Sequence, residues 1–139
     1  MPALSHALVV ATLLLAAPKP ATPPAAPALP AFEQKAFDAA LKGGAPMVVI
    51  VAATWCPVCK AQETILGRLR GTPEFKEVKV FRVDFDAQGE AVKLFRADSQ
   101  STILAFKGGK EVGRWVGETK EDRIAIMMKR TLPDAAQTP

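Results

Sequence analysis

The spacing of hydrophobic positions alternates between helix-like and strand-like patterns along the chain after residue 31. Apolar residues that recur every three or four positions predict helices, and short apolar runs bounded by glycine or polar residues predict strands. The predicted helices cover residues 32–42, 56–70, 88–96 and 119–132. The predicted strands cover residues 47–53, 78–84, 102–106 and 111–116. This order predicts an α/β domain with a central mixed sheet of about four strands flanked by helices.

Local signals support several of these boundaries. Pro57 is compatible only with the first turn of its helix, where the missing N–H is not needed. The segment 107–110, Lys-Gly-Gly-Lys, predicts a hairpin turn between the last two strands. Thr119 followed by Asp122 resembles a capping box that would begin the final helix.

The first 31 residues have a different composition. Residues 7–17 are apolar apart from Thr12, which is about the length of a signal-peptide core and shorter than the roughly 20 residues that span a bilayer. Residues 18–31 contain six prolines and five alanines, a composition that favours an extended spacer unable to pack a core. Both features indicate export from the cytoplasm, with the apolar segment either cleaved or retained as an anchor.

We therefore divide the 139-residue chain into four parts. Residues 1–17 are predicted to be a signal peptide or short membrane anchor, and residues 18–31 a Pro/Ala-rich linker. Residues 32–133 are predicted to form one domain, and residues 134–139 a disordered tail. The sequence predicts a periplasmic or otherwise exported protein, held at a membrane by its N-terminus if the apolar segment is retained.

Composition and charge exclude some classes of function. The chain is 49% hydrophobic and 23% charged, as expected for a folded domain. Its net charge of +4 is small and the two signs are interspersed, so nucleic acid is not an expected partner. One histidine and two cysteines cannot supply four zinc ligands from one chain, and we expect neither a metal nor a cofactor.

The two cysteines, Cys56 and Cys59, straddle the predicted start of the second helix. A helix N-terminus and the nearby Lys60 both stabilise a thiolate, which is the nucleophile of disulfide exchange. We expect Cys56 to be the accessible thiol that attacks the substrate disulfide, and Cys59 to resolve the mixed disulfide, leaving a Cys56–Cys59 disulfide. The intervening residues 57–58, Pro-Val, add no charge that would make a strong oxidant, so the sequence favours reduction.

Other interpretations remain open from the residues alone. The pair could be a disulfide oxidase or isomerase, a static disulfide, half of a zinc site shared with another chain, or an incidental feature of a binding module. Asp84 and Asp86 are interpreted as solvated acids at a strand end. Lys107, Lys110 and Arg114 are interpreted as a solvated face of the hairpin.

Three segments resemble the thioredoxin superfamily, and the likeness extends over residues 32–132. Residues 55–60, Trp-Cys-Pro-Val-Cys-Lys, are similar to the active-site motif; residues 83–86, Val-Asp-Phe-Asp, are similar to the end of the family's second strand. Residues 102–109 are similar to the strand and glycine turn that follow the family's cis-proline. The spacing of Cys59, Lys60 and Glu63 is similar to that in the C-terminal thioredoxin domain of transmembrane disulfide reductases.

The resemblance implies a thioredoxin-like fold and a thiol:disulfide oxidoreductase, most simply a monomeric reductase of protein disulfides. It implies that Cys56 and Cys59 are the catalytic disulfide pair and that Trp55 and Pro57 contact the substrate. The partners it implies are disulfide-containing proteins and a membrane electron donor of the transmembrane disulfide reductase type.

Two departures from the family pattern concern the site. Ile50 stands where cytosolic thioredoxins carry a buried acid, so Glu63, one helical turn beyond Cys59, is our candidate proton acceptor. Ser101 stands at the cis-proline position, and we expect Gln100 and Ser101 to contact the substrate close to the cysteine pair. A cis bond without proline costs ~3 to 4 kcal/mol, so the Gln100–Ser101 bond is expected to be trans.

Overall fold

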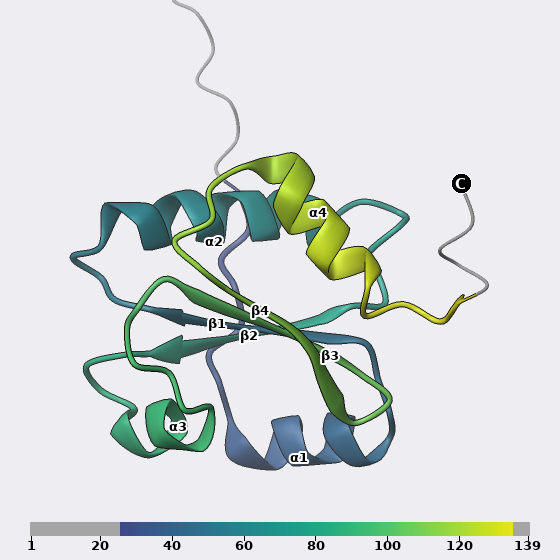
Figure 1. The fold of residues 1–139 in the computed structure, drawn as a ribbon, viewed down its shortest axis with the longest axis horizontal. Coiled ribbons are helices and arrows are strands. Elements are labelled where there is room, and N and C mark those ends of the chain that lie inside the picture. Colours follow the sequence, from purple (N-terminus) through teal and green to yellow (C-terminus); the bar gives the residue numbers. More distant parts are fainter. Residues whose placement is uncertain (1–25, 135–139) are drawn as a thin grey trace, which may run out of the picture.

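The computed structural model describes residues 26–134 of the chain (Figure 1). In chain order its elements are α1 (Gln34–Lys42), β1 (Met47–Ala52), α2 (Pro57–Arg70), β2 (Lys79–Asp84), α3 (Gly89–Leu94), β3 (Thr102–Lys107), β4 (Lys110–Val116) and α4 (Glu121–Lys129). The predicted order of helices and strands is confirmed, with ends that shift by a few residues.

The four strands form one mixed sheet in the order β2-β1-β3-β4. Strand β1 runs parallel to β2 and antiparallel to β3, and β3 and β4 form the predicted hairpin. Helices α2 and α4 cover one face of the sheet, and α1 and α3 cover the other (Figure 1). The chain therefore has the predicted fold class, a mixed sheet between two helical layers.

Strand β1 is the centre of the core, and each of its residues is buried. Alternate side chains of a strand point to opposite faces. Val48, Ile50 and Ala52 pack with α2 and α4, whereas Met47, Val49 and Val51 pack with α1 and α3. This burial on both faces explains the unbroken apolar run, and it fixes the end of β1 that leads into Cys56.

The domain begins earlier than the predicted boundary at residue 32. Residues 26–31, which we call the strap, lie against the domain. The N–H of Arg82 donates to the carbonyl of Pro30 at 2.8 Å, and the N–H of Phe32 donates to the carbonyl of Arg82 at 2.7 Å. Leu29 packs against the core on the α2 side. The linker prediction is therefore wrong at its C-terminal end, because a proline carbonyl can still accept a hydrogen bond from an edge strand.

The remaining predictions for the termini lie outside the described residues. These are the signal peptide or anchor at 1–17, the linker at 18–25 and the tail at 135–139. Between residues 26 and 134, none of the helices has the length and hydrophobicity needed to cross a bilayer.

The capping box predicted at Thr119 is not formed. The N-cap of α4 is Lys120, whose side chain makes no capping hydrogen bond. The carboxylate of Glu118 instead accepts from the N–H groups of Thr119 at 3.0 Å and Lys120 at 2.9 Å. The pKa of Glu118 is lowered, chiefly by the hydrogen bond from the N–H of Lys120. Desolvation raises it in part, whereas Arg123 and the N–H of Thr119 lower it further. Glu118, rather than Thr119, therefore satisfies the N–H of the N-cap residue Lys120.

Candidate active site

Cys56 and Cys59 lie at the N-terminus of α2, directly after the buried strand β1. The structure joins them in a disulfide with a Cα–Cα distance of 5.3 Å. Cys56 is the N-cap of α2, and its Sγ accepts a hydrogen bond from the N–H of Cys59 at 3.1 Å. Pro57 occupies the first turn, as predicted. One N–H of the first helical turn, that of Cys59, is thus directed at the sulfur of Cys56, where it would stabilise a thiolate.

The exposures of the two cysteines follow the expected order. Cys56 is 3% exposed and Cys59 is fully buried. Both residues are nevertheless buried in the disulfide form, in which the Cys56 sulfur accepts a hydrogen bond from the N–H of Cys59. The prediction of an accessible Cys56 applies to the reduced protein, in which the two thiols are separate.

Trp55 forms an exposed but fixed surface next to the disulfide. Its side chain is 60% exposed, and its Nε1 donates to the carboxylate of Asp86 at 2.8 Å. Asp86 is exposed, as the sequence suggested, and its carboxylate also orients the indole. Val58 and Val116 are also exposed apolar residues. We call Trp55, Val58 and Val116 the apolar rim.

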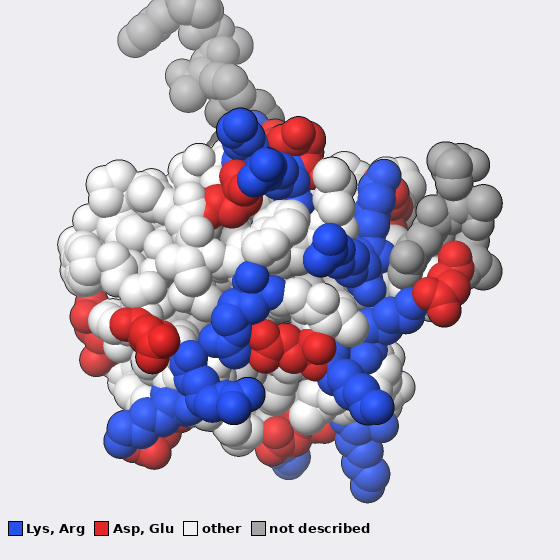
Figure 2. All heavy atoms as spheres, in the orientation of Figure 1, with Lys and Arg blue, Asp and Glu red and all other residues white. Residues whose placement is uncertain are grey.

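The members of the apolar rim come from different elements but share one end of the sheet. Trp55 and Val58 flank the start of α2, and Val116 ends β4 opposite Thr102 at the start of β3. In Figure 1 the start of α2 and the end of β4 both lie at the left of the sheet, and Figure 2 shows few charges on the upper part of that flank. In this view the surface near the start of α2 is therefore largely uncharged.

Ser101 directly precedes β3, in a strained backbone conformation. Its φ of +60° lies in the left-handed region, and the residue is buried. No cis peptide bond occurs in residues 26–134, so Gln100–Ser101 is trans, as predicted. Because Thr102 pairs with Val51 near the end of β1, Ser101 lies at the same end of the sheet as Cys56. Gln100 is partly buried beside it.

The side chain of Glu63 forms an ion pair with Arg82 of β2. Arg82 also contacts Asp84 at 3.3 Å and lies opposite the buried Ile50 in the β1–β2 register. Burial lowers the pKa of Arg82, but hydrogen bonds and charges from Glu63 and Asp84 outweigh burial and raise it. Glu63 of α2 thus supplies a carboxylate on the face of the sheet where β1 carries the apolar Ile50. Sequence reasoning found Glu63 but not its arginine partner.

Gln62 is a further residue of this region that sequence reasoning missed. It is fully buried on α2, and its Nε2 donates to the backbone carbonyls of Ser101 at 3.1 Å and Glu118 at 2.9 Å. The available signal was its spacing, since Gln62 shares the inward face of the helix with Cys59 and Leu66. Neither acceptor can be predicted from the sequence, because both lie on loops far along the chain.

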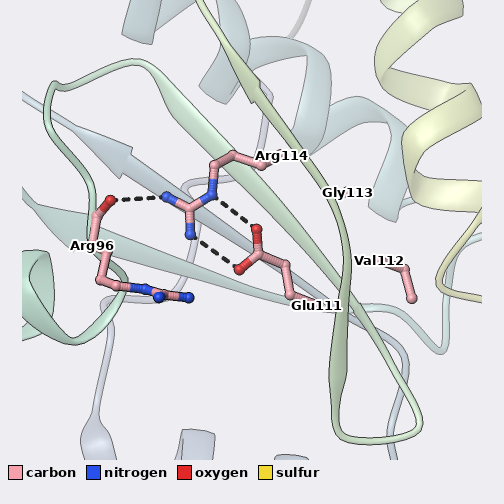
Figure 3. Close-up of a pocket in the computed structure, with 5 residues that line it drawn as sticks. All are labelled: Arg96, Glu111, Val112, Gly113 and Arg114. Atoms are coloured by element: carbon pink, nitrogen blue, oxygen red, sulfur yellow. Dashed lines mark hydrogen bonds and ion pairs between the residues drawn. The ribbon is translucent and has the colours of Figure 1, made fainter.

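Arg114 is not part of a solvated hairpin face, as the sequence suggested. Its guanidinium donates to the carbonyls of Phe95 at 2.8 Å and Arg96 at 3.0 Å and pairs with Glu111. Figure 3 shows Arg96, Glu111 and Arg114 at a pocket whose lining residues do not include the cysteines. Arg114 thereby ties β4 to the start of the loop that leads to Ser101.

The described residues contain no group of three or more histidine, cysteine, aspartate or glutamate side chains placed to hold a metal ion. The chemistry that the structure presents is that of a disulfide at a helix N-terminus, next to an uncharged surface. This arrangement defines a thiol–disulfide oxidoreductase.

Comparisons with known proteins identify the family. A family model described as Thioredoxin matches residues 29–130, and the chain therefore belongs to the thioredoxin family. A thioredoxin of Aspergillus fumigatus is 34% identical over 76 residues, which cover 55% of this chain and 69% of that protein. The crystal structure of Trxlp from Edwardsiella tarda is 39% identical with a TM-score of 0.70, covering 73% of this chain and 98% of that one. The thioredoxin structure of Fasciola hepatica is 28% identical with a TM-score of 0.61, covering 70% of this chain and 90% of that one.

Proposed function

We propose that this thiol–disulfide oxidoreductase is an exported reductase of protein disulfides. The observation that carries the proposal is the placement of Cys56 as the N-cap of α2, with the N–H of Cys59 directed at its sulfur. The residues between the cysteines, Pro57 and Val58, carry no charge or histidine that would favour the reduced form strongly enough to make an oxidant. The apolar rim supports a protein substrate, since it provides uncharged surface beside the disulfide.

The reaction begins with the reduced pair. The Cys56 thiolate attacks one sulfur of the substrate disulfide, forms a mixed disulfide and releases the other substrate sulfur as a thiolate. Cys59 then loses its proton and attacks the Cys56 sulfur, which releases the second substrate thiolate and forms the Cys56–Cys59 disulfide. Two electrons pass from the pair to the substrate. In this scheme Glu63 accepts the Cys59 proton, and Trp55, Pro57, Gln100 and Ser101 contact the substrate.

Reduction of insulin by the purified protein, with dithiothreitol as electron source, tests the proposal. We expect turnover by the wild type and no turnover by Cys56→Ser. Reduced Cys59→Ser, freed of dithiothreitol before insulin is added, is expected to trap a mixed disulfide. An inactive wild type would contradict reductase activity toward proteins. Equal activity of wild type and Cys56→Ser would show that the cysteine pair is not responsible.

The reduction potential tests the direction. Equilibration with glutathione buffers is expected to place the pair nearer the roughly −270 mV of thioredoxin than the roughly −120 mV of a strong disulfide oxidant. A value near the oxidant end would instead assign the protein to disulfide formation. Each difference of ~30 mV corresponds to about 1.4 kcal/mol, so the two outcomes are well separated.

Export and recharging by a membrane electron donor are supported by the N-terminal sequence and by the Cys59-Lys60-x-x-Glu63 spacing. Residues 1–31 fused to an alkaline phosphatase, which is active only after export, are expected to produce active enzyme in bacteria. Deletion of residues 7–17 from the same fusion is the matched control. Equal phosphatase activity of the two fusions would contradict export through this segment.

A further inference from the structure

Gln62 connects the helix of the cysteine pair to two loops at the same end of the sheet. Its Nε2 donates to the carbonyl of Ser101, before β3, and to the carbonyl of Glu118, between β4 and α4. Both acceptors lie far from α2 in the sequence, and the Gln62 side chain is fully buried. The amide therefore forms a three-way junction between the helix and these loops.

The orientation of this amide is fixed by its surroundings. Two carbonyl oxygens can accept only from the NH2 group, so Nε2 must face the loops. Oε1 then points into the interior, where no hydrogen-bond donor among the described residues reaches it. An apolar side chain of similar length would avoid burying Oε1, but it would lose both hydrogen bonds to the loop carbonyls.

The Ser101 carbonyl that Gln62 holds belongs to a strained segment. The φ of Ser101 is +60°, a conformation that non-glycine residues seldom adopt. The same carbonyl also accepts from the N–H of Gly117 at 2.9 Å. A strained backbone persists only when its neighbours over-determine it, and these two donors supply that constraint.

We propose that Gln62 is a positioning residue that holds the Ser101 segment in the shape that receives a substrate polypeptide. The inference rests on the proposed function at one point, that the substrate is a protein. The hydrogen bonds of Gln62 end on backbone carbonyls, not on Cys56 or Cys59. Its loss should therefore weaken the capture of a polypeptide and leave exchange with a small disulfide unchanged.

The test compares Gln62→Met with Leu66→Met. Methionine matches the length of glutamine but donates no hydrogen bond, so Gln62→Met removes the junction and fills the space. Leu66 is also fully buried on α2, one turn further on, which makes Leu66→Met a matched control for altered packing. Gln62→Leu serves as a second apolar variant if Gln62→Met does not fold.

The first measurement is hydrogen exchange at the Gly117 amide, which does not depend on activity. We expect exchange at least fivefold faster in Gln62→Met than in wild type, with the amides of β1 unchanged and Leu66→Met like wild type. Unchanged exchange at Gly117 would overturn the proposed constraint. This outcome is independent of insulin turnover, so a wild type without activity on insulin would refute the proposed function alone.

The second measurement is steady-state kinetics with insulin and with oxidised glutathione. For Gln62→Met we expect the KM for insulin to rise at least fivefold while kcat changes less than twofold, and the rate with oxidised glutathione and the reduction potential to match wild type. A purely structural role predicts a parallel loss on both substrates. A parallel loss, or an unchanged KM for insulin, would overturn the assignment.

Discussion

At the scale of single residues, the site contains a polar cluster on the sheet beneath α2. Glu63 reaches down from the helix to Arg82, and Arg82 in turn contacts Asp84 at the end of β2. Glu63 is one helical turn beyond Cys59, and its side chain is 25% exposed. Arg82 thus holds the carboxylate in place, and the carboxylate keeps access to water.

We predict that Glu63→Gln slows the resolving step by about tenfold or more, since general base catalysis contributes ~100-fold or more where it operates. The pH–rate profile of insulin reduction should change shape, because glutamine cannot accept the Cys59 proton. Glu77→Gln, at an exposed position before β2, is the control and should follow wild type. Profiles of Glu63→Gln and wild type that superimpose would assign Glu63 a purely structural role.

The order of cysteine reactivity is a second prediction for single residues. In the reduced protein the N–H of Cys59 should still favour a thiolate at the Cys56 sulfur, and Cys59 is the more buried residue. Limiting iodoacetamide should therefore label Cys56 first, as peptide mass spectrometry would show. Preferential labelling of Cys59 would reverse the assignment of attacking and resolving thiols.

Asp84 gives a prediction about pH and stability. Its carboxylate accepts from the N–H groups of Ala87 at 2.9 Å and Asp86 at 3.0 Å. The pKa of Asp84 is lowered, chiefly by the hydrogen bond from the N–H of Ala87. Desolvation raises it in part, whereas Arg82 and the N–H of Asp86 lower it further. A lowered pKa in the folded state stabilises the protein above the unfolded value of about 3.9, and this stability is lost as the pH falls through the folded pKa.

We therefore expect Asp84→Asn to cost about 1 to 2 kcal/mol at pH 7, because the acceptor loses its charge, which weakens these hydrogen bonds and removes the ion pair with Arg82. The penalty should shrink between pH 5 and pH 2, where wild type loses the same contribution. Urea unfolding at several pH values measures this, with Asp38→Asn on the exposed face of α1 as control. A penalty that stays constant down to pH 2 would contradict the role of the Asp84 charge.

At the scale of elements, the strap completes the domain. In chain order it first lies against α2, where Gly67 has no side chain and allows close approach, and then runs along the edge of β2. A Cβ at Gly67 would lie 2.8 Å from the carbonyl oxygen of Pro27 and 3.2 Å from Cβ of Ala26. The strap thereby covers an edge strand that would otherwise present unpaired N–H and C=O groups.

Gly67→Ala tests this contact, since alanine in a helix interior is normally favoured by about 1 kcal/mol over glycine. In the full chain, the added Cβ would clash with the carbonyl of Pro27. This clash should cancel the gain and displace residues 26–29, which a protease could then cleave. In a chain that begins at Pro30, the same substitution should stabilise the domain by about 0.5 to 1 kcal/mol. Gly89→Ala, where a Cβ meets open space, is the control and should have the same effect in both chains. Equal effects of Gly67→Ala in the two chains would contradict the packing of the strap.

The elements themselves were predictable because their signals are local. The apolar run of β1, Pro57 at the start of α2 and the Gly-Gly turn before β4 each depend on neighbouring residues. The cysteine pair was predictable for the same reason. The Gln62 junction, the Glu63–Arg82 pair and the docking of the strap depend on residues brought together only by folding, and no short-range pattern encodes them.

At the scale of the whole molecule, charge is unevenly distributed with respect to the site. Figure 2 shows lysine and arginine side chains over the centre, the right and the lower left of this view, interleaved with acidic ones, whereas the upper left flank is largely uncharged. That flank is where α2 begins in Figure 1, and the apolar rim of Trp55, Val58 and Val116 belongs to the same end of the sheet. Capture of a protein substrate should therefore depend on apolar contact rather than on long-range attraction.

This distribution predicts a weak salt dependence of catalysis. Charges separated by more than ~10 Å are screened at about 0.1 M salt, so electrostatically steered encounters slow steeply as salt is added. We expect kcat/KM for insulin to change less than twofold between low salt and roughly 0.3 M sodium chloride, where screening is nearly complete. Val116→Ser, at the exposed end of β4, should instead lower kcat/KM for insulin by about threefold or more, since it removes apolar area from the rim. A kcat/KM that falls tenfold with salt, together with a Val116→Ser variant that matches wild type, would show that charge rather than the apolar rim captures the substrate.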